Sequence, residues 1–176
     1  MSATHIALLR GINVGKAKRI AMADLKRIVE SLGCTGVKTL LNSGNVVFTT
    51  RRKVTGAALQ KAIRDDTGVD SRTTVLSATE LKTVMRENAL LELATDPSRL
   101  LVYVPSDTEV LATFRALQGS DWAPEVLAVG SRAAYVWTPE GVLAGKLFEL
   151  VNRQLRDTVT ARNWATMLKL EALVAG

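Results

Sequence analysis

A segment near the start of the chain, residues 10–19, has the residue types of an anion-binding loop. It follows an apolar run and precedes an amphipathic one, which predicts a loop. Glycine lets the backbone adopt positive φ and approach a ligand closely, and clustered Lys and Arg attract anions. We therefore expect a phosphate site here. Its candidate ligand-binding residues are Arg10, Gly11, Asn13, Gly15, Lys16, Lys18 and Arg19.

A turn signal between two short apolar runs offers a partner for this loop. The residues Asn42, Ser43, Gly44 and Asn45 join the runs and predict a β-hairpin. In a βαββαβ unit the loop after the first strand and this hairpin lie at the same end of the sheet. Together they would supply cations, amides, a hydroxyl and backbone N–H groups, which form anion nests. The alternative is a solvated basic loop beside a structural turn.

The spacing of the two loop glycines excludes a P-loop. A Walker A loop has four residues between its glycines and a Ser or Thr after its Lys. Here three residues separate Gly11 from Gly15, and Ala17 follows Lys16. An NTPase site of that kind is therefore not expected.

A second cluster of candidate residues lies near the end of the chain. Thr160 is a plausible N-cap of a final helix, which would place Arg162 and Asn163 in the first turn, followed by Trp164. Lys146 lies near the start of the preceding helix. A cation at such a position opposes the helix dipole, so it either holds a ligand phosphate or pairs with a carboxylate. Trp164 fits a core position as well as a site.

The order of periodic segments predicts an α+β fold. The first half reads as strand, helix, two strands, helix and strand, and the second half repeats that order with a last strand that is short or replaced by a helix. We expect two ferredoxin-like (βαββαβ) halves, the second degenerate, packed together with an extra C-terminal helix. Residues 1–96 would form a basic half with a trailing helix, and residues 97–176 the second half with the C-terminal helix.

The charge is concentrated in the first half. Residues 1–72 hold 13 Lys and Arg against 5 Asp and Glu, whereas residues 73–176 hold 10 against 12. Such asymmetry is typical of proteins that bind nucleic acid or phosphorylated ligands. The chain has no apolar stretch of membrane-spanning length and no signal-peptide pattern. Its single cysteine, Cys34, fits a buried thiol and a cytoplasmic location.

The remaining residue types give little support to other chemistry. The only histidine, His5, lies in an apolar strand, so we expect no metal site, no Ser-His or Cys-His catalysis and no cofactor. Tyr103, Tyr135 and Trp137 could form a stacking face for RNA, but their surroundings lack the RNA-recognition signature. We expect them in a core between the two halves.

Four segments together resemble the signatures of the bacterial domain of unknown function 1697 family. They are residues 8–15, residues 42–48, Lys146-Leu147 and residues 160–164. The resemblance implies an α+β fold with ferredoxin-like halves, and it implies no established activity. The signature residues in this chain are Arg10, Gly11, Asn13, Gly15, Ser43, Gly44, Asn45, Lys146, Arg162, Asn163 and Trp164.

Three functions are compatible with these features. The leading hypothesis is a cytoplasmic protein that binds nucleic acid or another phosphorylated ligand through the basic loop and the hairpin. An enzyme acting on a nucleotide-like or phosphorylated small molecule is the second, with Arg10, Lys146 and Arg162 as an electrostatic clamp. A scaffold or dimerisation domain is the third.

Overall fold

The computed structural model describes all 176 residues, which form two compact units. Unit 1 consists of Met1–Leu81 and Leu170–Gly176, and unit 2 of Lys82–Lys169. The boundaries fall inside two helices, α3 (Ala78–Arg86) and α6 (Trp164–Ala175). No helix combines the length and the apolar character needed to cross a membrane.

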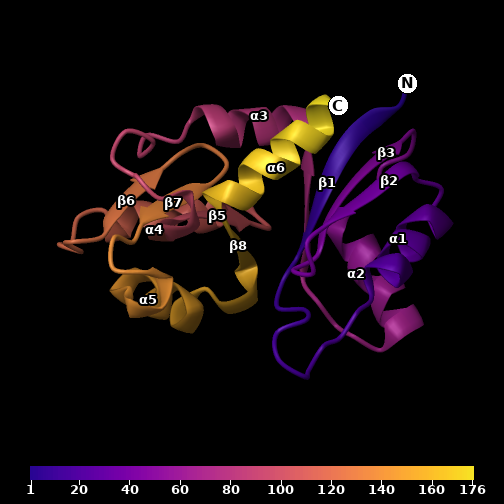
Figure 1. Cartoon of the computed structure of the whole chain (residues 1–176), viewed down its shortest axis with the longest axis horizontal. Helices are drawn as coiled ribbons and strands as arrows, with labels where there is room; N and C mark the ends of the chain where they lie inside the picture. Colours follow the sequence, from indigo (N-terminus) through magenta and orange to yellow (C-terminus); the bar gives the residue numbers. More distant parts are fainter. The chain divides into compact units, whose positions relative to one another are not determined.

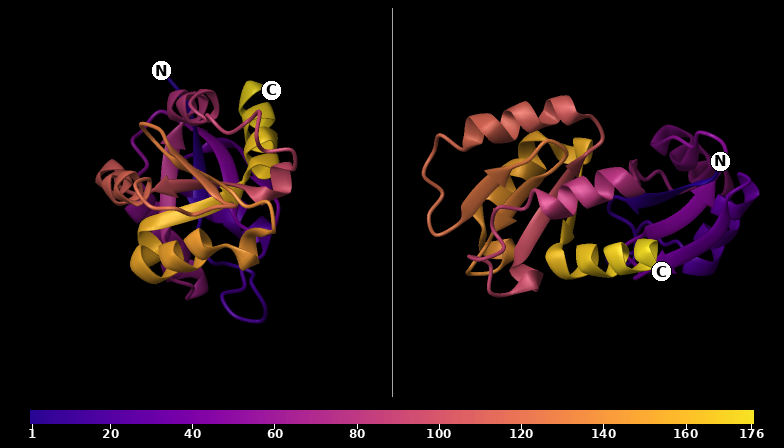
Figure 2. Two further views of the ribbon diagram at one scale, coloured as in Figure 1. Left: turned by 90° about the vertical axis from the view of Figure 1, so that its left-hand side faces the viewer. Right: turned by 90° about the horizontal axis from the view of Figure 1, so that it is seen from above.

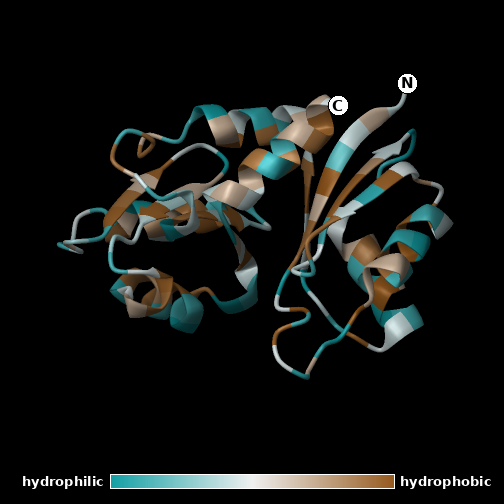
Figure 3. Ribbon diagram, viewed as in Figure 1, coloured by the Kyte–Doolittle hydropathy of each residue, from teal (hydrophilic) through white to brown (hydrophobic).

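Unit 1 has the strand order of a ferredoxin-like fold (Figure 1). Its antiparallel sheet runs β2-β3-β1-β4, and α1 and α2 lie side by side on one face (Figures 1 and 2). In Figure 3 the strands of unit 1 show brown stretches among paler and teal ones, and α1 and α2 carry both teal and brown segments. The elements are β1 (Ala3–Leu9), α1 (Met22–Ser31), β2 (Thr35–Leu40), β3 (Asn45–Thr50), α2 (Gly56–Thr67) and β4 (Thr73–Ser77).

The helix boundaries of unit 1 follow local capping signals. Thr55 Oγ1 accepts a hydrogen bond from Ala58 N at 3.1 Å and so caps the start of α2. Gly68 ends the helix with φ of 75°. At the start of α3, Ser77 N donates to the Glu80 carboxylate at 2.8 Å, and Glu80 N donates to Ser77 Oγ at 3.1 Å. This reciprocal pair is a capping box.

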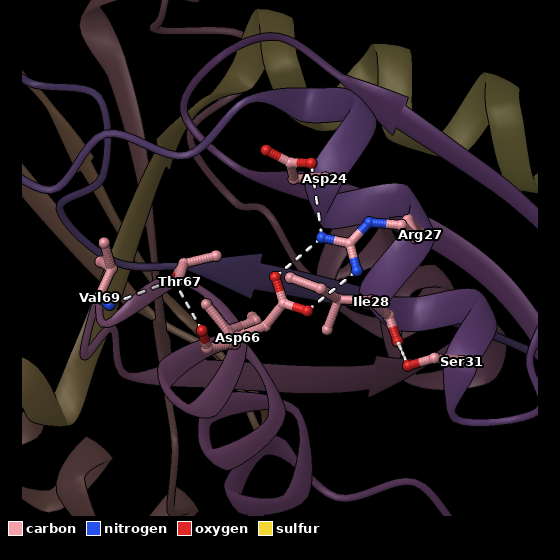
Figure 4. A network of polar contacts seen from close by, with 8 residues as sticks. Asp24, Arg27, Ile28, Ser31, Asp66, Thr67 and Val69 are labelled. Carbon is pink, nitrogen blue, oxygen red and sulfur yellow. Dashed lines mark hydrogen bonds and ion pairs between the residues drawn. The ribbon is translucent and has the colours of Figure 1, made fainter.

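An exposed ion pair connects α1 to α2 (Figure 4). The Arg27 guanidinium donates to both carboxylate oxygens of Asp66, at 2.9 and 2.8 Å, and lies 3.5 Å from Asp24. The hydrogen bond from Arg27 lowers the pKa of Asp66 below its ordinary value. Because the pair is open to solvent, its contribution to stability is small.

Unit 2 repeats the same topology. Its sheet runs β6-β7-β5-β8, and its first strand again pairs with the third and the fourth. The chain therefore has an α+β fold with two four-stranded antiparallel sheets, as expected. The elements are β5 (Leu100–Pro105), α4 (Leu111–Leu117), β6 (Val126–Val129), β7 (Ala134–Trp137), α5 (Lys146–Gln154), β8 (Val159–Asn163) and the first part of α6.

The end of unit 2 corrects one expectation from the sequence. A helix beginning at Thr160 is wrong, because Thr160 lies in β8 opposite Val104 of β5. The β-branched side chains of Val159 and Thr160 favour a strand. Asn163 provides the cap instead, since its Oδ1 accepts a hydrogen bond from Thr166 N at 2.9 Å. The second half thus keeps its fourth strand.

The three aromatic residues considered for RNA stacking, Tyr103, Tyr135 and Trp137, are buried and form no stacking surface. Tyr103 packs against Phe114 with ring centroids 5.5 Å apart. The Tyr135 hydroxyl donates to Val84 O at 2.6 Å, and Trp137 is 7% exposed. All three side chains are therefore buried, and Tyr103 belongs to the core cluster of unit 2.

The two tyrosines give a testable consequence of this burial. Burial raises the pKa of Tyr103 and of Tyr135, and the carboxylates of Glu125 and Glu87 respectively raise each further. A raised folded-state pKa stabilises the fold below the unfolded value, near pH 10, and this contribution is lost at higher pH. We therefore expect ultraviolet titration to show no tyrosinate in the folded protein at about pH 10.5. The protein unfolded in urea is the control, because its solvent-exposed tyrosines should form tyrosinate near pH 10. Tyrosinate in the folded protein near pH 10 would contradict the burial.

Candidate functional site

Three connections meet at one end of the sheet in unit 1. Because β1 is antiparallel to both neighbours, its end lies opposite their starts, with Leu8 paired to Asn45 and Leu9 paired to Thr73. The loop of residues 10–21 therefore lies beside the β2–β3 hairpin and the α2–β4 turn. In Figure 1 this loop is the indigo segment that projects beyond the end of β1. We call these three connections (residues 10–21, 41–44 and 68–72) the loop edge.

Asn13 holds the loop in shape. Its side-chain nitrogen donates to Ile20 O at 2.9 Å and to Asn42 O at 2.8 Å, and its side-chain oxygen accepts from Ile20 N at 2.8 Å. The backbone adds a hydrogen bond from Asn13 N to Lys18 O at 3.0 Å. Asn13 thus closes the loop on itself and fastens it to the hairpin, so its amide is used for structure.

The hairpin is fitted to the loop through Gly44 and Asn45. Gly44 has φ of 89°, and a Cβ placed there would lie 2.8 Å from Leu9 Cβ and 2.8 Å from Ile12 Cδ1. Asn45 is fully buried and donates to Leu40 O at 2.7 Å and Ser43 Oγ at 3.0 Å. Gly44 therefore allows the hairpin to pack closely on the loop, and Asn45 fixes the conformation of the hairpin.

The α2–β4 turn completes the loop edge and was not identified from the sequence. Arg10 N donates to Arg72 O at 3.0 Å, and Ser71 Oγ donates to Arg10 O at 2.7 Å. The available signal was topological, because the fourth strand of a βαββαβ unit is also antiparallel to the first and starts at the same end.

The outer part of the loop presents cations without carboxylate partners. Lys16, Lys18 and Arg19 are exposed and form no ion pair. Lys18 Nζ donates to the Asp70 backbone carbonyl at 3.3 Å and Arg19 Nη1 to that of Gly15 at 3.1 Å, which neutralises neither charge.

The basic residues of the helices differ from the loop cations in this respect. All four basic residues of α1 and α2 lie within ion-pair distance of an Asp or Glu side chain. The uncompensated charge of unit 1 therefore lies away from its helices. The paired residues are Lys26 with Glu30, Arg27 with Asp66, Lys61 with Asp65, and Arg64 with Asp70.

Apolar side chains lie exposed beside these cations. Val14 is 73% exposed at the tip of the loop, and Leu41 is 47% exposed in the hairpin. Leu41 also has φ of 58°, which is uncommon for a bulky residue. The Asn13–Asn42 hydrogen bond joins the segments that carry them. The loop edge thus combines positive charge with exposed apolar surface.

In unit 2 the start of α5 is already occupied by a carboxylate. Lys146 is exposed at the first helical position, as expected from the sequence. Glu125 accepts a hydrogen bond from Lys146 N at 2.8 Å and from Leu147 N at 3.3 Å. A Cβ on Gly145 would lie 2.5 Å from a Glu125 oxygen. An anionic ligand at this helix terminus would meet that carboxylate, which argues against Lys146 as a phosphate clamp.

Arg162 and its neighbours also have structural positions in unit 2. The expected place of Arg162 in a first helical turn is wrong, because it lies in β8 and is 8% exposed. Burial lowers its pKa to about 10, and its Nη1 donates to Ala161 O at 2.9 Å. Asn163 caps α6, and Trp164 is buried.

The structure contains no cluster of three or more His, Cys, Asp or Glu residues arranged to hold a metal ion.

The candidate residues fall into two groups in different units. The first group, at the loop edge of unit 1, is Arg10, Gly11, Asn13, Gly15, Lys16, Lys18, Arg19, Asn42, Ser43, Gly44 and Asn45, and the second, in unit 2, is Lys146, Arg162, Asn163 and Trp164.

Comparison with known proteins identifies the family. The chain is similar over 99% of its length to 99% of a conserved bacterial protein from Streptococcus pneumoniae, with 21% identity and a TM-score of 0.78, which supports the fold. A protein from Bacteroides thetaiotaomicron aligns over 96% of this chain and 97% of its own with 11% identity, but its TM-score is only 0.24. No curated protein matches the chain. The model of the family described as "Protein of unknown function (DUF1697)" matches residues 2–135, which include the loop edge. The chain belongs to the DUF1697 family.

Proposed function

We propose that the protein binds single-stranded nucleic acid through phosphate contacts at the loop edge. The observation that carries this proposal is the set of three exposed cations, Lys16, Lys18 and Arg19, that have no carboxylate partner on a loop fixed by Asn13. A fixed loop supports binding because less conformational entropy is lost when the ligand docks.

The chemistry of the loop suits a phosphodiester backbone. Lys16, Lys18 and Arg19 place three charged donors within four residues of one another, and such donors form strong hydrogen bonds to phosphate oxygens. The exposed side chains of Val14 and Leu41 offer apolar contact to sugars and base faces. Contacts of this kind position a strand without reading its sequence.

The proposed partner is therefore a polynucleotide, with no cofactor. We place the protein in the cytoplasm, because the buried Cys34 is its single cysteine and a reducing compartment suits such a thiol.

Fluorescence anisotropy of labelled single-stranded RNA and DNA across a salt series tests the proposal. If about four phosphates are engaged, the logarithm of the affinity falls with the logarithm of the salt concentration with a slope near −3. We expect similar slopes for unrelated sequences. An absence of binding at low salt, or binding that is independent of salt, would contradict the proposal.

Two other outcomes would point to the alternative functions. Saturable stabilisation by one nucleotide or sugar phosphate, without oligonucleotide binding, would support an enzyme. A mass that rises with protein concentration, without any effect of anions, would support a scaffold.

A further inference from the structure

The opposite end of the sheet in unit 1 carries a second basic surface. After β3 ends at Thr50, the chain turns through Arg51, Arg52 and Lys53. Thr50 Oγ1 accepts a hydrogen bond from Arg52 N at 3.1 Å and donates to Arg52 O at 3.0 Å. The side chain of Thr50 therefore fixes the turn through backbone atoms and leaves the guanidinium groups available.

A concave pocket lies beside this turn. Its volume is about 440 Å³, within the range of small-ligand sites. Hydroxyl-bearing Ser2, Thr35 and Thr49 line it together with Arg51 and Arg52. We call it the arginine pocket. Thr35 Oγ1 lies 3.5 Å from Thr49 O, a long contact that leaves this hydroxyl able to turn towards a ligand.

The charge of the arginine pocket is uncompensated. No Asp or Glu lines it, and Arg51, Arg52 and Lys53 form no ion pair. Arginine presents a planar fork of donors that matches phosphate oxygens, and hydroxyls supply further donors. The lining therefore favours a compact, strongly charged anion.

The shape of the pocket distinguishes it from the loop edge. The six residues of β3, Asn45–Thr50, separate the two surfaces, a distance of roughly 17 Å along a strand. One phosphate group cannot contact both. The loop edge projects outwards and suits an extended strand, whereas the pocket is concave. No aromatic residue lines the pocket, so it offers no platform for base stacking.

We propose that the arginine pocket binds a compact phosphate compound of the pyrophosphate or phosphate-ester class, independently of the loop edge. Arg51 and Arg52 hold the phosphate oxygens, and the hydroxyls of Thr35 and Ser2 donate to them. Lys53 adds to the local positive charge.

Isothermal titration of the full chain with inorganic pyrophosphate tests this site. We expect saturable binding to a single site, weakened about tenfold or more in the double variant Arg51→Gln/Arg52→Gln, because two charge-assisted interactions are removed. Thr50 contacts only the backbone of Arg52, so the turn is expected to persist, and thermal unfolding checks the fold. The triple variant Lys16→Ala/Lys18→Ala/Arg19→Ala serves as the control and retains pyrophosphate binding.

Two results would overturn the proposal. One is an absence of saturable pyrophosphate binding, or binding that the double variant leaves unchanged. The other is a loss of oligonucleotide binding in the double variant equal to that in the triple variant, which would make the pocket part of a polynucleotide path. Because the two probes and the two variants are separate, failure of one site leaves the test of the other intact.

Discussion

Replacing Lys16, Lys18 and Arg19 together by alanine is expected to weaken binding of a single-stranded oligonucleotide by two to three orders of magnitude at low salt. Each phosphate contact with a single strand contributes a salt slope of about 0.7, which corresponds to roughly eightfold in affinity at about 50 mM salt. Removing three such interactions together multiplies to a factor on the order of 500. The side chains of all three residues are exposed, so the free energy of unfolding should change little. Anisotropy measures the weakened binding.

A charge-matched control separates contact from net charge. The variant Lys26→Ala/Lys61→Ala/Arg64→Ala removes the same three charges from the formal net charge of +6, but it does so on α1 and α2, where each cation has a carboxylate partner. We expect this variant to bind nearly as well as the original protein. An equal loss of affinity in both variants would mean that only net charge matters and that the loop edge is not a site.

Replacing Gly44 by alanine is expected to lower the free energy of unfolding by about 2–5 kcal/mol. Two effects add. The positive φ of 89° is unfavourable for alanine, at about 1–2 kcal/mol. The added Cβ would also lie 2.8 Å from Leu9 and from Ile12, and overpacking of this kind costs roughly 1–3 kcal/mol. Urea unfolding followed by circular dichroism measures the change through the transition midpoint.

Gly15 provides the matched control for that substitution. It has a similar backbone conformation, with φ of 63°, but a Cβ added there would have no other atom within 4 Å. Gly15→Ala therefore carries the backbone strain alone, about 1–2 kcal/mol. Equal destabilisation at the two positions would show that the hairpin does not pack on the loop as described.

The strand and helix order of unit 1, and of unit 2 up to its last strand, could be predicted because local signals agree with the periodicity. Thr55 and Gly68 bound α2 as expected, and the Ser77–Glu80 capping box begins α3. The helix start expected at Thr160 was wrong, and it lay in a segment with two residues suited to an N-cap. Because β8 pairs with β5, Thr160 lies in a strand and Asn163 caps the helix instead. That pairing depends on residues far away in the sequence, so local signals could not reveal it.

The candidate site was predictable in its position and not in the roles of its residues. Ferredoxin-like topology brings the loop to the hairpin, which follows from strand order. Whether a cation is neutralised depends on a partner elsewhere, as for Arg27 with Asp66. The structural role of Asn13 likewise depends on a hydrogen bond from its side chain to the backbone of Asn42, which lies 29 residues away. Composition therefore located the charge, and the structure distinguished exposed cations from residues that hold the fold.

The salt dependence of oligonucleotide binding, compared between the original protein and the Lys16→Ala/Lys18→Ala/Arg19→Ala variant, tests the central claim most directly. Removing three phosphate-binding side chains should reduce the magnitude of the slope by about 2, from near 3 to near 1. The charge-matched variant on α1 and α2 should keep the original slope. An unchanged slope in the loop variant would contradict the assignment of the loop edge as the phosphate-binding surface.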